Sequence, residues 1–136
     1  MNAAVLDASV VVKWFGEVDE RHLDKARRLR GAYASGELTA FAPPLLRLEV
    51  LNVAGRRWRL TEAALASFAA TLDELRLELL DPEPAHVARW VARGLTAYDA
   101  AYVALAECEA IPLVTDDDLI VRTAPGIAVA LADGTA

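Results

Sequence analysis

The sequence predicts an α/β domain with a central, mainly parallel β-sheet, and three observations support this. Short apolar runs typical of buried strands alternate with longer segments that carry apolar residues at helical spacing. Proline or glycine separates several of these segments, as expected where strands and helices end. Asp7 and the Asp116–Asp118 triplet come at the carboxyl ends of two of the predicted strands. Alternating strands and helices are typical of a parallel sheet covered by helices, so we expect one domain over residues 1–136.

Five short apolar runs are predicted to form the sheet. The first run, Ala3–Leu6, ends at Asp7, and the second, 38–42, stops at Pro43 because proline cannot donate to a strand ladder. The run at 111–114 is ended by Thr115. The remaining two predicted strands are 77–80 and 127–131.

Helical segments are predicted between these strands. Thr61 and the Thr96-x-x-Asp99 pair provide the polar side chains that begin helices, and Pro44 suits a first helical turn. The helix over 100–110 contains five alanines, which allow close packing against a sheet. The full set of predicted helical segments is 10–15 (a short helix or turn), 19–33, 45–58, 62–75, 84–92, 100–110 and a short one ending near 124.

Composition excludes several classes of protein. The 136 residues are 55% hydrophobic and 25% charged, which argues against disorder. The single cysteine, Cys108, excludes a disulfide framework and a cysteine-rich zinc site, and it fits the cytoplasm. The net charge of −6 argues against general coating of nucleic acid. We see no signal peptide and no apolar stretch long enough to span a membrane.

Acidic residues at four places form the candidate site. Asp7 and the Asp116–Asp118 triplet follow strands, so they are expected at the same edge of a parallel sheet, where ligands bind. Glu49 and Asp99 lie on predicted helices among apolar or small neighbours. Each also has a simpler explanation: Asp7, Asp99 and Asp118 fit helix capping, and Glu49 fits a solvated helix surface.

The joint arrangement favours a hard metal ion. Adjacent carboxylates repel one another by about 1 kcal/mol per close pair in water, and a buried carboxylate needs a cation or hydrogen bonds. Because His22 and His86 are the only histidines, we expect no histidine near these acids. A ligand set made only of oxygens favours Mg²⁺ or Mn²⁺ over zinc.

Four motifs in order resemble the PIN domain, and closely the small single-domain toxins of the VapC family. They are Val5-Leu6-Asp7-Ala8-Ser9, Glu49 with Asn52 on one helix face, the run from Tyr98-Asp99 to Ala106, and Leu113-Val114-Thr115-Asp116-Asp117. The resemblance implies a PIN-like three-layer α/β/α sandwich. It also implies a ribonuclease that hydrolyses RNA phosphodiester bonds with Mg²⁺, or with Mn²⁺ as a substitute.

The resemblance also assigns roles to individual residues. The catalytic, metal-binding acids it implies are Asp7, Glu49, Asp99 and Asp117. Asp116 competes with Asp117 for the fourth position, and Asp118 is left to capping. The supporting polar residues it implies are Ser9, Asn52 and Thr115.

By the same resemblance, the protein partners would be a cognate VapB-like antitoxin and a second copy of the chain, in a homodimer and in a toxin–antitoxin hetero-oligomer. Two basic clusters are candidates for RNA contact: Arg21, Lys25, Arg27, Arg28 and Arg30; and Arg47, Arg56, Arg57 and Arg59.

Two other classes of function are weighed against the nuclease. A catalytically inactive PIN-fold module that binds a partner would tolerate loss of the acids, yet all four are present. A phosphotransfer enzyme or receiver domain also gathers aspartates at strand ends. However, Asp7-Ala8-Ser9 lacks a second aspartate, and the only lysines, Lys13 and Lys25, occur too early in the chain for a receiver.

Overall fold

A computed structural model describes residues 1–16 and 21–133 and confirms the α/β class. Its sheet has five parallel strands in the order β3-β2-β1-β4-β5. The strands are β1 (Ala3–Leu6), β2 (Thr39–Ala42), β3 (Glu78–Leu79), β4 (Leu113–Thr115) and β5 (Ala128–Ala130). Four strands have ends within one residue of those predicted, whereas β4 begins two residues later than predicted and includes Thr115.

Strand β1 occupies the centre of the sheet, and its sequence explains why. Ala4, Val5 and Leu6 are all fully buried, because a central strand of a parallel sheet is covered by helices on both faces. Val5 lies opposite Phe41 of β2 on one side and Leu113 of β4 on the other. The continuous apolar run therefore marks the middle of the core.

The predicted helices are also present. They are α1 (Ala8–Val11), α2 (Leu23–Ser35), α3 (Leu45–Arg56), α4 (Glu62–Glu74), α5 (Pro84–Ala92), α6 (Ala97–Glu109) and α7 (Asp118–Thr123), with a short 3₁₀ helix, η1 (Val12–Trp14), after α1. The predicted start of a helix at Asp19 lies outside the described residues. That helix passes through Gly31 and ends where Gly36 adopts a left-handed conformation with φ of 83°.

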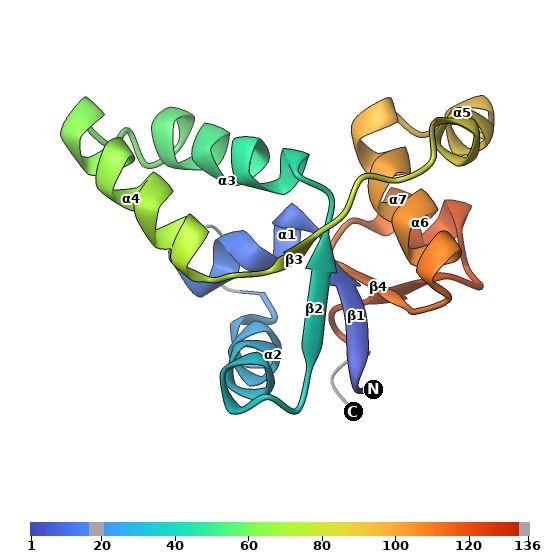
Figure 1. Ribbon diagram of the computed structural model, residues 1–136, viewed down its shortest axis with the longest axis horizontal. Coiled ribbons are helices and arrows are strands. Elements are labelled where there is room, and N and C mark those ends of the chain that lie inside the picture. Colours follow the sequence, from blue (N-terminus) through green and yellow to red (C-terminus); the bar gives the residue numbers. More distant parts are fainter. Residues whose placement is uncertain (17–20, 134–136) are drawn as a thin grey trace.

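The helices form layers around the sheet, as Figure 1 shows. Helix α6 packs on β1 and β4, with α5 against it, while α2 and η1 lie together on the opposite side. Ala100 and Ala104 of α6 are fully buried, which lets this helix approach the strands closely. Helices α3 and α4 lie side by side beyond the carboxyl ends of β1 and β2, and α3 also contacts α1.

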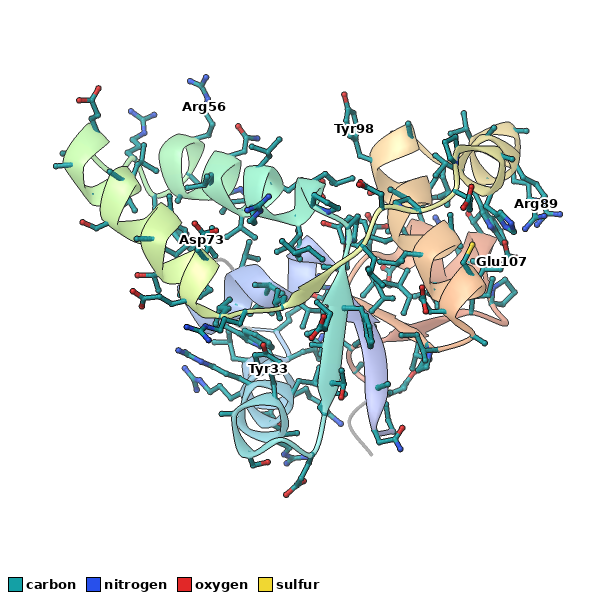
Figure 2. The ribbon with its side chains drawn as sticks, viewed as in Figure 1. Tyr33, Arg56, Asp73, Arg89, Tyr98 and Glu107 are labelled. Atoms are coloured by element: carbon teal, nitrogen blue, oxygen red, sulfur yellow. The ribbon has the colours of Figure 1, made fainter. Side chains whose placement is uncertain are left out.

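A polar cluster fixes α5 to α6 on the outside of the molecule. Arg89 forms an ion pair with Glu107, as Figure 2 shows, and His86 Nδ1 lies 3.1 Å from the same carboxylate. Trp90 Nε1 donates to Glu107 Oε1 at 3.3 Å. These contacts hold the helix that carries Asp99. No helix of the described ranges is long and apolar enough to cross a bilayer.

Candidate functional site

The candidate site lies at the carboxyl end of the central strand. Strand β1 pairs with β2 on one side and with β4 on the other, so the connections leave in opposite directions. Such a switch point is where open α/β sheets bind ligands. The Asp7 amide donates to Val114 O at 3.0 Å, which fixes Asp7 beside the end of β4.

Two hydroxyl groups hold the carboxylate of Asp7. Asp7 occupies the N-cap position of α1, but its side chain makes no capping hydrogen bond, so the capping explanation is wrong for this residue. Instead Oδ2 accepts from Ser9 Oγ at 2.6 Å and from Thr115 Oγ1 at 2.8 Å. The same two hydroxyls accept from the Asp116 and Asp117 amides, at 3.0 and 3.1 Å respectively. Asp7 is therefore connected to the turn that follows β4.

Glu49 is oriented by a tyrosine that the sequence analysis missed. Tyr102 of α6 is fully buried, and its hydroxyl donates to Glu49 Oε1 at 2.6 Å. The signal was present in the sequence, because Tyr102 lies three residues after Asp99 in a helix otherwise rich in alanine. A buried tyrosine requires a hydrogen-bond partner. Asn52, one helical turn after Glu49, is exposed on the cleft wall.

Asp99 is both a capping-box residue and a member of the acidic group. Its amide donates to Thr96 Oγ1 at 3.1 Å, as the Thr-x-x-Asp pattern predicts. The carboxylate is partly buried, and burial followed by the charge of Asp117 raises its pKa, against the opposing effect of Thr96. Capping and membership of the site are compatible here. The neighbouring Tyr98 points away into solvent, as Figure 2 shows.

Burial and mutual repulsion raise the pKa of the other two acids as well. For Asp7, burial is the main cause; the hydroxyls of Ser9 and Thr115 oppose it, and the charges of Asp99 and Asp117 add to it. For Glu49, burial again dominates, opposed by Tyr102 and reinforced by Asp7 and Asp99. The acid that follows β1, those of α3 and α6, and Asp117 after β4 therefore share one electrostatic environment, and a cation would relieve their repulsion.

The three consecutive aspartates divide into different roles. Asp117, and not Asp118, is the helix cap: its Oδ1 accepts from the Leu119 and Ile120 amides at 2.8 and 3.3 Å. The prediction that capping belongs to Asp118 is thus wrong, because Asp118 is already in the first turn of α7 and is exposed.

Asp116 is engaged by basic side chains. Its Oδ2 lies 3.3 Å from Lys13 Nζ and its Oδ1 lies 3.1 Å from His22 Nδ1. The expectation that no histidine lies near the acids is therefore wrong for Asp116. His22 precedes α2 and is 94 positions away in sequence, so only the fold brings the two together.

A cleft of about 560 Å³ opens beside these residues. Its lining includes the polar and acidic side chains of Ser9, Glu49, Asn52 and the three aspartates, together with the basic side chains of Lys13, Arg21 and Arg57. Asp7 and Asp99 are outside its lining, and Asp7 is 5% exposed. The cleft combines the two charge signs that binding a metal ion and a phosphate backbone would need.

The loose arrangement of these carboxylates suits a hydrated divalent cation better than a fully enclosed one. Within residues 1–16 and 21–133, no three His, Cys, Asp or Glu side chains form a ready-made metal cage. Mg²⁺ usually keeps several waters and binds proteins through one or two carboxylates, so a loose group of acids suits it. The carboxylates that would hold such an ion are Asp7, Glu49, Asp99 and Asp117.

Comparison with known families decides the membership of the chain. Residues 4–125 match the family described as PIN domain. The chain belongs to the PIN-domain family. PIN domains are generally nucleases that use divalent metal ions, which agrees with the acidic edge of this sheet.

A solved structure supports the same fold. The crystal structure of PAE2754 from Pyrobaculum aerophilum is similar to this PIN domain, with a TM-score of 0.67 and 25% sequence identity. The match covers 97% of this chain and 90% of that protein. No curated protein matches this chain.

Proposed function

We propose that this PIN domain is a metal-dependent ribonuclease and the toxin of a type II toxin–antitoxin pair. The observation that carries the nuclease proposal is the group of Asp7, Glu49, Asp99 and Asp117. These acids come from separate segments, and burial, with a further contribution from charges within the group, raises the pKa values of Asp7, Glu49 and Asp99. A protein gains little from such mutual repulsion unless a cation or a reacting group uses it.

The protein's own residues orient the acids. Ser9 and Thr115 hold one oxygen of Asp7, Tyr102 holds one oxygen of Glu49, and the first amides of α7 hold one oxygen of Asp117. In each case hydrogen bonds fix one oxygen of the carboxylate and thereby set the orientation of that carboxylate. When bound, Mg²⁺ or Mn²⁺ would lower the pKa of a coordinated water and neutralise charge on the phosphoryl oxygens.

The cleft supports nucleic acid as the substrate. The protein has a net charge of −6, so a phosphate backbone must be held by local positive charge. Arg57, near the end of α3, and Arg21, before α2, both line the cleft. They belong to the two basic clusters of the sequence and would guide the backbone towards the acids.

RNA as the substrate, and the toxin role, rest on the resemblance of the four motifs to VapC toxins. The same resemblance supports a cytoplasmic protein that forms a homodimer, and a hetero-oligomer with a VapB-like antitoxin. We expect the antitoxin to suppress cleavage when it is added to the purified chain in equal amount.

Cleavage of a mixed RNA pool by the purified, antitoxin-free chain tests the nuclease. We expect cleavage with Mg²⁺ or Mn²⁺, none with EDTA, and none by Asp7→Asn or Asp99→Asn. Asp81→Asn is the matched control, because Asp81 is exposed in the loop after β3. Single-stranded DNA of the same composition, tested in parallel, establishes which nucleic acid is cut.

Two results would contradict the proposal. Cleavage that survives both site substitutions would show that the activity comes from another site or a contaminant. Absence of both metal binding and cleavage in the wild type would favour the alternative, a catalytically inactive PIN-fold module that binds a partner.

A further inference from the structure

Lys13 is a buried cation beside the acidic group, and the proposed catalytic residues do not include it. It lies on η1, its side chain is 3% exposed, and it lines the cleft. Burying an ammonium group is costly unless it is paired and hydrogen-bonded. Lys13 lies too early in the sequence to be the lysine of a receiver domain, but the fold places it beside Asp116.

The contacts of Lys13 converge on Asp116 and on the chain before α2. Its Nζ lies 3.3 Å from Asp116 Oδ2 and donates to the Arg21 carbonyl at 2.9 Å. His22 Nδ1 takes the other oxygen of Asp116 at 3.1 Å. Both oxygens of Asp116 therefore have basic neighbours, and the side chain is only 11% exposed.

Asp117 faces a different environment although it is the next residue. Asp117 is the N-cap of α7, with φ of −98° and ψ of 114°, whereas Asp116 lies one residue earlier, in the bend that follows β4. Asp117 Oδ1 accepts hydrogen bonds from the first amides of α7. The charge of Asp117 contributes to the raised pKa values of Asp7 and Asp99. The hydroxyls of Ser9 and Thr115 fix the amides of this turn.

We infer that Lys13 is a positioning residue that pairs with Asp116, keeps this carboxylate out of the metal-ligand set, and leaves Asp117 as the fourth acid. The inference rests on the proposed function, because it concerns the metal site of that nuclease. The inference gives each of the three adjacent aspartates its own role. Asp116 pairs with Lys13 of η1 and with His22 before α2, Asp117 is the fourth acid of the metal site, and Asp118 is the first residue of α7.

Charge arithmetic makes the inference testable. In the wild type the charges of Lys13 and Asp116 cancel. Lys13→Met leaves one extra negative charge near the metal, Asp116→Asn leaves one extra positive charge, and the double variant restores the balance. At several ångströms and an intermediate dielectric, one charge changes the Kd for a divalent ion by about tenfold or more.

The experiment measures the Kd for Mn²⁺ by calorimetry on the chelator-treated chain of 136 residues, with thermal melting to check folding. We expect Lys13→Met to bind Mn²⁺ about tenfold more tightly, Asp116→Asn about tenfold more weakly, and the double variant within about twofold of the wild type. Lys13→Arg should retain the wild-type Kd. Arg93→Met removes a positive charge at the exposed end of α5, outside the cleft lining, and is expected to leave the Kd unchanged.

A double variant that binds Mn²⁺ as weakly as Asp116→Asn would overturn the inference, because Asp116 would then be a ligand. Equal Kd values for all variants would overturn it too and leave Lys13 a purely structural role. If Lys13→Met does not fold, the comparison of Asp116→Asn with the double variant still decides. Wild-type chain that binds Mn²⁺ but never cleaves RNA contradicts the proposed function alone, and wild-type chain that binds no Mn²⁺ contradicts both.

Discussion

The substitution Asp7→Asn tests whether the charge of Asp7 destabilises the folded protein when no metal is bound. The Asp7 carboxyl is 5% exposed, and burial together with the charges of Asp99 and Asp117 raises its pKa. The amide of asparagine has nearly the same shape and no charge. Its oxygen still accepts from the hydroxyls of Ser9 and Thr115. We therefore expect the variant to be more stable than the wild type in EDTA at neutral pH.

The magnitude follows from the linkage between pKa and stability. Each unit by which the folded-state pKa exceeds the unfolded value costs about 1.4 kcal/mol at a pH above both. Asp7→Asn removes this cost, so we expect it to raise the free energy of unfolding, and with it the Tm. For a chain of this length, 1 kcal/mol corresponds to a Tm change of about 3 to 4 °C.

The stability difference between the wild type and Asp7→Asn should depend on pH. Because the folded-state pKa is raised, the wild type is not penalised below the unfolded value of about 3.9, where Asp7 is protonated in both states. The wild type then loses stability relative to Asp7→Asn as pH rises through the folded-state pKa of Asp7, because the buried carboxyl must ionise. The Tm difference in EDTA should therefore be small near pH 4 and grow towards pH 7, if measured by calorimetry or circular dichroism.

Adding metal should reverse the order. Mn²⁺ at about 100 times its Kd stabilises a protein that binds it by about 2.7 kcal/mol, so the wild type should gain stability and Asp7→Asn should not. The control Asp81→Asn is expected to follow the wild type in both conditions. An Asp7→Asn protein that melts several degrees below the wild type in EDTA at pH 7 would refute the reasoning, because the charge would then be stabilising.

Three further substitutions test the arrangement around the acids. Tyr102→Phe removes the hydrogen bond to Glu49 and should lower the free energy of unfolding, measured by urea denaturation, by about 0.5 to 1.5 kcal/mol. RNA cleavage should fall several-fold. Unchanged cleavage would mean that Tyr102 does not orient Glu49. Asp117→Asn and Asp117→Ala should both abolish cleavage, but only the alanine variant loses the cap of α7. Its free energy of unfolding should therefore be about 1 kcal/mol below that of the asparagine variant. Equal stability of the two variants would contradict the capping role. Ala104→Leu inserts bulk where α6 meets the sheet and should cost about 1 to 3 kcal/mol in the same assay; a neutral effect would show that this contact is loose.

Much of the fold was predictable because its signals are local. The strand Ala3–Leu6 is a continuous apolar run ended by an acid, and the start of α6 is marked by Thr96 and Asp99 three residues apart. The segment predicted over 19–33 was expected to end by Gly36, and helix α2 does stop at Ser35, where Gly36 adopts a left-handed conformation. Strand order was not predictable, because pairing depends on crossovers between distant segments.

The sequence by itself determined which acids follow strands, and hence that Asp7 and the aspartate triplet share one edge of the sheet. It could not divide the work among Asp116, Asp117 and Asp118, because adjacent residues of one type differ only in what surrounds them. The tertiary structure decided this by bringing Lys13 and His22 to Asp116 and the first amides of α7 to Asp117. It also decided the partner of Glu49, since Tyr102 is 53 positions away in the sequence and only the fold brings its hydroxyl to this carboxylate.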